Sequence, residues 1–149
     1  MSGSIVVGVD GSETSSFAVR WGTREAVLRG EALRLVSVWE MPTFGSSFGA
    51  AAYSGDLVKA LRETAEDNLA QALDIVRAIT NDVEVTMEAV EGNAASILLD
   101  RSREADLLVV GSRGLGGFRD LLLGSVSERC ANHAACPVVI VRHLQPNGP

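Results

Sequence analysis

The residue types best suited to chemistry gather in a glycine-rich segment, Gly111-Ser-Arg-Gly-Leu-Gly-Gly117, which continues to Leu123-Gly-Ser-Val-Ser127. Glycines let a backbone turn tightly and bring its N–H groups close to a ligand without interference from a Cβ atom. Gly124 and Ser125 are expected to open a helix, whose free N–H groups and positive dipole end favour an anion. With the Ser125 and Ser127 hydroxyls and the charge of Arg113, the segment predicts a phosphate cradle. Glycine loops also serve as plain structural turns, so the residues alone leave both interpretations open.

A second loop, Gly8-Val-Asp-Gly-Ser12, follows an apolar run at residues 5–9. In open parallel sheets, ligands bind beyond the carboxyl ends of the strands, which is where both loops would lie. Asp10 is the candidate binding residue of this loop. It is also explained as a turn residue or a helix cap, because Asp before Gly is a common turn pair.

The best-known phosphate motifs do not match the glycine-rich segment. A P-loop requires GxxxxGK[ST] after the first strand, and no lysine lies near this segment. A dinucleotide fingerprint requires a third glycine where this chain has Arg119, and it opens the first helix rather than following the fourth strand.

The rest of the sequence alternates between short apolar runs and longer amphipathic segments. The apolar runs predict strands at 5–9, 33–39, 83–89, 107–110 and 138–141. Helices are predicted at 14–29, 56–80, 93–103 and 125–134, and in the first of them Phe17, Trp21 and Leu28 share one face. This order predicts a single α/β domain over 1–149, with an open, mostly parallel sheet and helices on both faces. The role of the irregular stretch 42–55 stays open.

Composition excludes several classes of function. The chain has 149 residues and a net charge of −6, with 46% hydrophobic and 21% charged residues, so it has no basic face for general binding of nucleic acid or anionic membranes. No apolar stretch approaches the roughly 18 residues of a membrane span. The start lacks the features of a secretory signal. Cys130 and Cys136 are too few for a disulfide framework, which predicts reduced thiols and a cytoplasmic location.

Cys130, His133 and Cys136 are evenly spaced and suggest a metal site. Cys136 precedes Pro137 at a predicted strand start, however, and the sequence offers no evident fourth ligand. Structural thiols are therefore the favoured interpretation.

Three segments together resemble a known family. Gly111-x2-Gly114-x9-Gly124-Ser125 matches the G-2x-G-9x-G-(S/T) pattern of the ATP-binding branch of the universal stress proteins. Val7-Gly-Val-Asp-Gly-Ser12 and Cys136-Pro-Val-Val-Ile-Val141 are also similar to that family. The resemblance covers a core of about 5–142 and leaves a short tail at 143–149.

The resemblance implies a Rossmann-like fold with five parallel strands in the order 3-2-1-4-5. It implies an adenine nucleotide ligand, either ATP or ADP or AMP, with Asp10 as a contact to phosphates through Mg²⁺ and with the Val38 backbone against adenine. The implied binding residues are Gly8, Val9, Asp10, Val38, Gly111, Ser112, Arg113, Gly114, Gly116, Gly117, Gly124, Ser125 and Val126. It also implies a homodimer, for which the strand at 138–141 is suited because an apolar edge strand needs covering.

The predicted function is that of a nucleotide-dependent regulator or sensor in a stress response. One alternative is a slow ATPase or phosphotransferase, although the loop lacks a lysine for the phosphates and neither histidine lies in it. A second alternative is a dimeric binding module that does not use nucleotide, which the intact glycine pattern disfavours.

Overall fold

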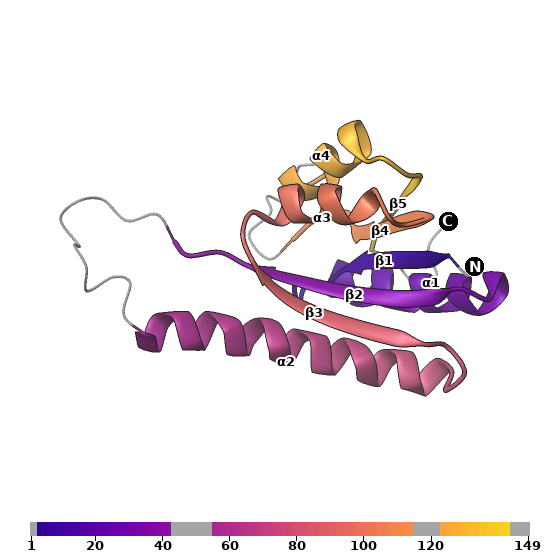
Figure 1. Ribbon diagram of the computed structural model, residues 1–149, viewed down its shortest axis with the longest axis horizontal. Coiled ribbons are helices and arrows are strands. Elements are labelled where there is room, and N and C mark those ends of the chain that lie inside the picture. The colour runs from indigo at the N-terminus through magenta and orange to yellow at the C-terminus, as the bar shows by residue number, and fades with distance from the viewer. Residues whose placement is uncertain (1–2, 43–54, 115–122, 144–149) are drawn as a thin grey trace.

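The computed structural model describes residues 3–42, 55–114 and 123–143. Its sheet consists of β1 (Ser4–Gly8), β2 (Ala32–Trp39), β3 (Val85–Glu91), β4 (Leu107–Gly111) and β5 (Val138–Val141). All neighbouring strands are parallel, and their order is β3-β2-β1-β4-β5 (Figure 1). The expected fold, including its strand order, is therefore confirmed.

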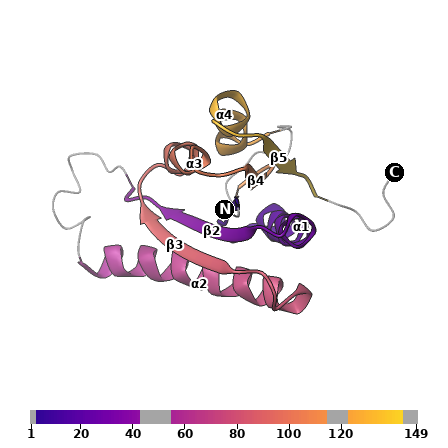
Figure 2. The ribbon, with the colours of Figure 1, turned by 45° about the vertical axis from the view of Figure 1, so that its right-hand side comes forward.

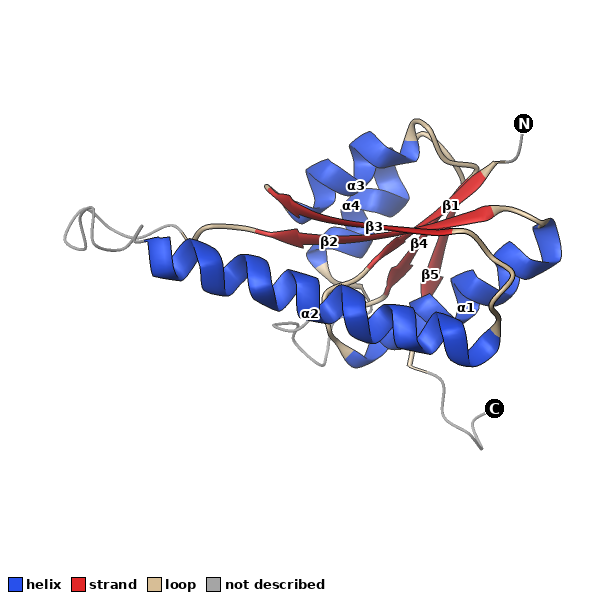
Figure 3. Ribbon diagram, turned by 60° about the horizontal axis from the view of Figure 1, so that its bottom comes forward, coloured by secondary structure: helices blue, strands red, loops and turns tan. Residues whose placement is uncertain are grey.

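Four described helices cover the two faces of this sheet: α1 (Glu13–Arg29), α2 (Gly55–Ile79), α3 (Ala94–Ser102) and α4 (Ser125–His133). Helices α1 and α2 pack on one face, and α3 and α4 pack on the other (Figures 2 and 3). Because each crossover returns to the start of a parallel strand, the helices begin at the edge of the sheet where the strands end.

Two apolar cores result from the alternation of side chains along the strands. On the α1 and α2 face the fully buried strand residues include Ile5, Val7 and Leu33. On the α3 and α4 face they include Val6 and Leu108. Strands β1 and β4 read as continuous apolar runs because both of their faces are covered.

Helix α1 buries a different face from the one predicted. Phe17 and Trp21 are partly buried, as expected, but the side chain of Leu28 is 81% exposed. The buried face carries small residues such as Ala18 and Gly22, and a Cβ atom built on Gly22 would lie 2.8 Å from Val7 Cγ2. Size rather than hydropathy decides this face, since the helix packs too closely on the central strands for large side chains.

Strand β3 lies at an edge, and it begins at Val85 rather than at Val83. Val83 is buried before the strand starts, whereas Met87, expected on the apolar face, is 48% exposed. Helix α2 covers this face of the edge strand only in part. Most of the stretch 42–55 lies outside the described residues. No helix in the described part of the chain is long and apolar enough to cross a membrane.

Candidate functional site

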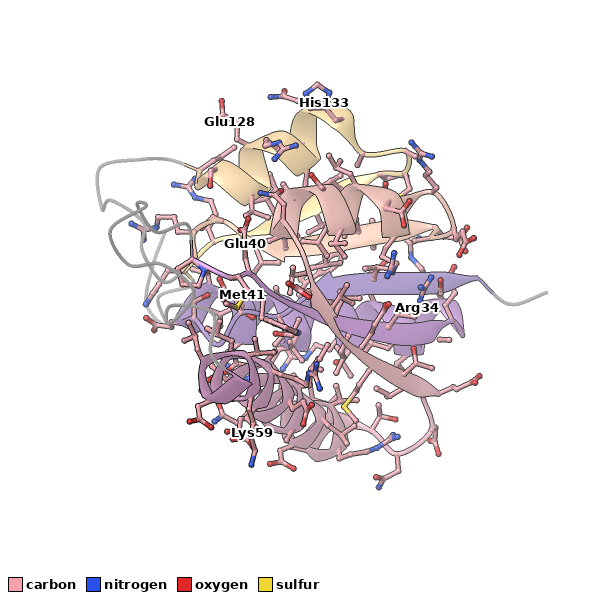
Figure 4. All side chains as sticks on the ribbon, turned by 60° about the vertical axis from the view of Figure 1, so that its left-hand side comes forward. Arg34, Glu40, Met41, Lys59, Glu128 and His133 are labelled. Carbon is pink, nitrogen blue, oxygen red and sulfur yellow. The ribbon has the colours of Figure 1, made fainter. Side chains whose placement is uncertain are left out.

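A cavity of about 430 Å³ lies beyond the ends of β1, β2 and β4, between the beginnings of α3 and α4. Figure 4 views the molecule from the side where β2 ends, with Glu40 and Met41 just beyond that strand. Ten of the predicted binding residues line the cavity: Gly8, Val9, Asp10, Val38, Gly111, Arg113, Gly114, Gly124, Ser125 and Val126. Ser112 is buried next to them. Gly116 and Gly117 lie outside the described residues.

One end of the cavity is formed by the loop after β4, in which the carbonyl groups of Ser112 and Arg113 accept hydrogen bonds from the protein. The Ser112 carbonyl accepts hydrogen bonds from Gly124 N at 2.6 Å and from Ser127 Oγ at 2.8 Å. The Arg113 carbonyl accepts one from Thr14 Oγ1 at 2.5 Å. Because protein donors satisfy these two carbonyl oxygens, their partial negative charges are partly neutralised, and an anion in the cavity meets less electrostatic repulsion from the loop.

Helix α4 begins at this loop without a side-chain cap. Its N-cap is Gly124, whereas α1 and α3 are capped by the side chains of Ser12 and Asn93. The first N–H groups of a helix lack intrahelical partners. At α4 they belong to residues that line the cavity, Ser125 and Val126 among them, and they are placed to donate to a ligand.

Ser127 has a different role from the one predicted. Its side chain was expected to offer a hydroxyl to a phosphate, but Ser127 is 2% exposed and its hydroxyl donates to Ser112 O. It therefore holds the start of α4 against the loop after β4. Ser125 is exposed, so its hydroxyl stays available at the cavity.

Asp10 serves as a turn residue and also faces the cavity. Its Oδ1 accepts a hydrogen bond from Ser12 N at 2.9 Å, around Gly11 with a left-handed φ of 82°. Its Oδ2 faces the glycine-rich loop, because a Cβ atom on Gly114 would lie 2.9 Å from that oxygen. One carboxylate oxygen thus supports the local turn, and the other is directed toward the candidate phosphate end.

Two glycines of the site leave little room for a larger residue, each because of a different neighbour. A Cβ atom on Gly111 would lie 2.8 Å from the backbone carbon of Thr14, so this glycine lets α1 begin against β4. A Cβ atom on Gly124 would lie 3.3 Å from Arg113 Cα, so this glycine lets the loop close on α4. Their primary role is to permit close packing within the protein, which in turn shapes the cavity.

The other end of the cavity is apolar. Its lining residues are Val36, Val38, Leu98 and Val110, and the apolar residues Ala94 and Val126 also line the cavity. Sequence reasoning included Val38 and Val126 and missed the α3 residues Ala94 and Leu98. Asn93, an expected N-cap, was the signal available, since a helix that follows β3 must begin beside the carboxyl ends of the strands.

The backbone of Val38 faces this apolar end. Val36 O accepts a hydrogen bond from Val9 N at 2.8 Å, so the polar groups of Val36 point toward β1. The N–H and C=O groups of Val38, two residues further along, point to the same side, but β1 has already ended at Gly8. Neither group has a backbone partner on that side among the described residues.

The two cysteines lie away from the cavity and are unpaired. Burial raises the pKa of the Cys130 thiol to about 11, and burial also raises the pKa of Cys136. Both groups are therefore thiols rather than thiolates at neutral pH. No group of three or more His, Cys, Asp or Glu side chains in the described ranges is placed to hold a metal ion.

The structure is an α/β domain with a glycine-rich cavity at the carboxyl ends of its parallel strands, and comparison with known proteins shows its family. The family model described as "Universal stress protein family" matches residues 1–142. The chain therefore belongs to the universal stress protein family.

Individual relatives agree with this assignment. A universal stress protein of Mycobacterium tuberculosis is 37% identical over 139 residues, which are 93% of this chain and 48% of the relative. The chain thus spans about half the length of the curated relatives it matches. A universal stress protein solved in complex with cAMP is 29% identical, with a TM-score of 0.62 and coverage of 93% of this chain and 95% of that chain. One from Archaeoglobus fulgidus, solved with dAMP, shares the fold at 20% identity, with a TM-score of 0.66 and coverage of 95% and 98%.

Proposed function

We propose that this protein binds an adenine nucleotide, with ATP, ADP and AMP as the candidates, and that occupancy of the site regulates a stress response. The observation that carries the proposal is the start of α4, which has no side-chain cap and lies beside the Ser112 and Arg113 carbonyl groups that are hydrogen-bonded within the protein. Free N–H groups and a positive helix end together favour a phosphate. The cAMP complex of a relative that is 29% identical supports an adenine nucleotide as the ligand.

The apolar end of the cavity accepts the base in this proposal. Adenine carries a hydrogen-bond acceptor at N1 beside a donor at N6, which complements one N–H and one C=O group from the same residue. Val38 offers that pair toward the cavity. Guanine carries a donor at N1 and an acceptor at O6, so it would place like groups against Val38.

The phosphates occupy the opposite end, at the first turn of α4 and the loop after β4. Among the described lining residues, Arg113 is the positively charged one and Asp10 is the negatively charged one. A single carboxylate fits Mg²⁺, which proteins bind through one or two carboxylates together with substrate phosphates. Asp10 would hold that ion through Oδ2, the oxygen directed at the glycine-rich loop.

The lining offers little for fast phosphoryl transfer. Among the described lining residues there is no lysine and no histidine, and Asp10 is the carboxylate available as a general base. We therefore expect hydrolysis far below the roughly 10 s⁻¹ of a median enzyme. Sustained turnover near that rate by protein free of contaminating ATPase would place the chain among the enzymes.

We also propose a homodimer that pairs β5 of two subunits. Strand β5 lies at the sheet edge, and its Val138, Val139 and Ile140 are only partly buried in one subunit. Val141, in contrast, is 5% exposed within the subunit's own core. Ile140→Lys should therefore give monomer or insoluble protein, whereas an unchanged dimer by light scattering would place the interface elsewhere. The unpaired thiols support the proposal of a reducing, cytoplasmic location.

Titration calorimetry of the purified protein with ATP, ADP, AMP and GTP tests the proposed ligand. Saturable binding of at least one adenine nucleotide, with GTP at least about tenfold weaker, is the expected result. Mass spectrometry of the small molecules released on denaturation identifies the nucleotide that accompanies the protein from cells. Absence of binding by all three adenine nucleotides, together with an extract free of them, would contradict the proposed function.

A further inference from the structure

Leu98, a residue of α3 that is 4% exposed, lines the cavity together with Gly8, and we call this part of the cavity its closed end. A Cβ atom built on Gly8 would lie 3.0 Å from Leu98 Cδ1 and 3.5 Å from Val110 Cγ1. The Leu98 side chain therefore lies directly over Gly8, at the end of β1. Leu98 therefore occupies the space that a side chain at position 8 would need, and both residues line the cavity.

Polar contacts at both ends hold α3, and with it Leu98, in place. At its C-terminal end, Arg101 donates two hydrogen bonds to Glu88 of β3, at 2.6 and 3.0 Å. At its N-terminal end, the N-cap Asn93 accepts a hydrogen bond from Arg129 of α4 at 3.1 Å. Figure 2 shows α3 lying against the sheet beside α4. A side chain on a helix fixed at both ends gives way less easily to a ligand than one on a loop.

The orientation of a base against Val38 decides which of its atoms meets this wall, and this step depends on the proposed function. Along a strand, the N–H group of a residue precedes its C=O group. An adenine with N1 at Val38 N–H and N6 at Val38 C=O therefore has its C2 atom directed back along β2, toward Val36. Val36 pairs in register with Gly8, over which Leu98 lies. The C2 position thus faces the closed end of the cavity.

We propose that Leu98 determines specificity at C2 of the base, so that the site accepts a purine with hydrogen at C2 and rejects purines with a larger group there. The wall is buried, apolar and packed against Gly8, so a C2 substituent displaces either Leu98 or the base from Val38. The 2-amino group of guanine meets the same wall, and it would be buried there without a hydrogen-bond acceptor from Leu98.

The test compares ATP with 2-methylthio-ATP by titration calorimetry, on the wild type and on Leu98→Ala, Leu98→Val and Leu99→Ala. Leu99 is a neighbouring leucine of the same helix that does not line the cavity, so it is the matched control. The wild type and Leu99→Ala should bind 2-methylthio-ATP at least about tenfold more weakly than ATP. Leu98→Ala should bring the two dissociation constants within about threefold of each other, and Leu98→Val should give an intermediate ratio.

The outcomes separate this proposal from the proposed function. A wild type that binds ATP and 2-methylthio-ATP equally well overturns the role of Leu98 and leaves nucleotide binding intact. The role of Leu98 is also overturned if a Leu98 variant keeps the wild-type circular dichroism spectrum and the wild-type ratio of the dissociation constants for 2-methylthio-ATP and ATP. Leu98→Val removes only one methylene group, so it supplies the test if Leu98→Ala does not fold. A wild type that binds no adenine nucleotide overturns the proposed function, and this proposal with it.

Discussion

Helices α3 and α4 begin beside the same cavity, and each has nine residues, but their first turns differ. At α3, Asn93 Oδ1 accepts a hydrogen bond from Ser96 N at 3.0 Å, so the helix satisfies one of its free N–H groups itself. At α4, Gly124 provides no side chain, and Ser127 directs its hydroxyl back to Ser112 O. The difference is that the first turn of α3 is capped by a side chain of its own sequence, whereas the first turn of α4 has no side-chain cap.

Of the substitutions that test this difference between α3 and α4, Gly124→Val should have the largest effect on ATP affinity. The added Cβ atom would lie 3.3 Å from Arg113 Cα, so the branched side chain would push the loop after β4 away from α4. ATP affinity should fall by at least about 100-fold, which corresponds to about 2.7 kcal/mol of binding free energy. Calorimetry on folded protein measures the effect.

Gly55→Val is the matched control for that substitution, because a Cβ atom on Gly55 meets no described atom within 4 Å. It should bind ATP as the wild type does. Equal affinity of Gly124→Val and Gly55→Val would show that the junction between the loop and α4 does not hold the phosphates.

Ser127→Ala tests whether the hydrogen bond from Ser127 to the loop after β4 positions the first turn of α4. The substitution removes the hydrogen bond to Ser112 O, while Gly124 N still satisfies that carbonyl. Thermal or urea unfolding should show a loss of about 1 kcal/mol, the typical net value of one hydrogen bond. ATP affinity should fall as well, because the first turn of α4 is held less firmly against the loop. An unchanged affinity would show that Ser127 is not needed to position the site.

Asn93→Ala, at the start of α3, should lower the free energy of unfolding but leave nucleotide affinity nearly unchanged. Loss of the N-cap should cost about 1 kcal/mol of the free energy of unfolding. Nucleotide affinity should stay within about threefold of wild type, since the capped end of α3 donates nothing to phosphates in this account. A loss of ATP binding comparable to that in Gly124→Val would mean that both helix ends bind the ligand.

The rate at which iodoacetamide labels Cys130 reports whether α4 stays packed in these variants. This rate should show the smallest difference between the variants and the wild type. The thiol is fully buried, and its pKa is raised to about 11 by burial. A raised pKa reduces the thiolate fraction at every pH below it, so labelling by iodoacetamide should be slow at pH 7 and accelerate as the pH rises toward 11. Peptide mass spectrometry measures the rate. Fast labelling at pH 7 in folded wild-type protein would contradict this packing.

The pattern of apolar runs and amphipathic segments was sufficient for an open parallel sheet with helices on both faces, whereas the strand order and most of the predicted lining residues were implied by the resemblance to a known family. The spacing of Gly111, Gly114 and Gly124 carried that resemblance, and all three glycines line the cavity. Packing distance is not encoded locally in the same way. Consequently the buried face of α1, the exposure of Met87 and the place of Leu98 over Gly8 became visible only in three dimensions.

The role of Ser127 illustrates the same limit within the site. A serine in the first turn of a helix donates equally well to a phosphate or to a nearby carbonyl. Only the position of Ser112 O, 2.8 Å away, decides between these partners. The chemistry of a residue type was therefore predictable, whereas the partner of each hydroxyl was not.

Amide chemical shifts measured during titration with ATP and with adenosine test the central claim most directly. Binding of ATP should shift the N–H resonances of Ser125 and Val126, whereas adenosine, which lacks phosphates, should leave them nearly unchanged. The Val38 amide should respond to both ligands, and the capped Ser96 amide of α3 should respond to neither. Saturable ATP binding that leaves the Ser125 and Val126 resonances in place would contradict the account, because the phosphates would then lie away from the start of α4.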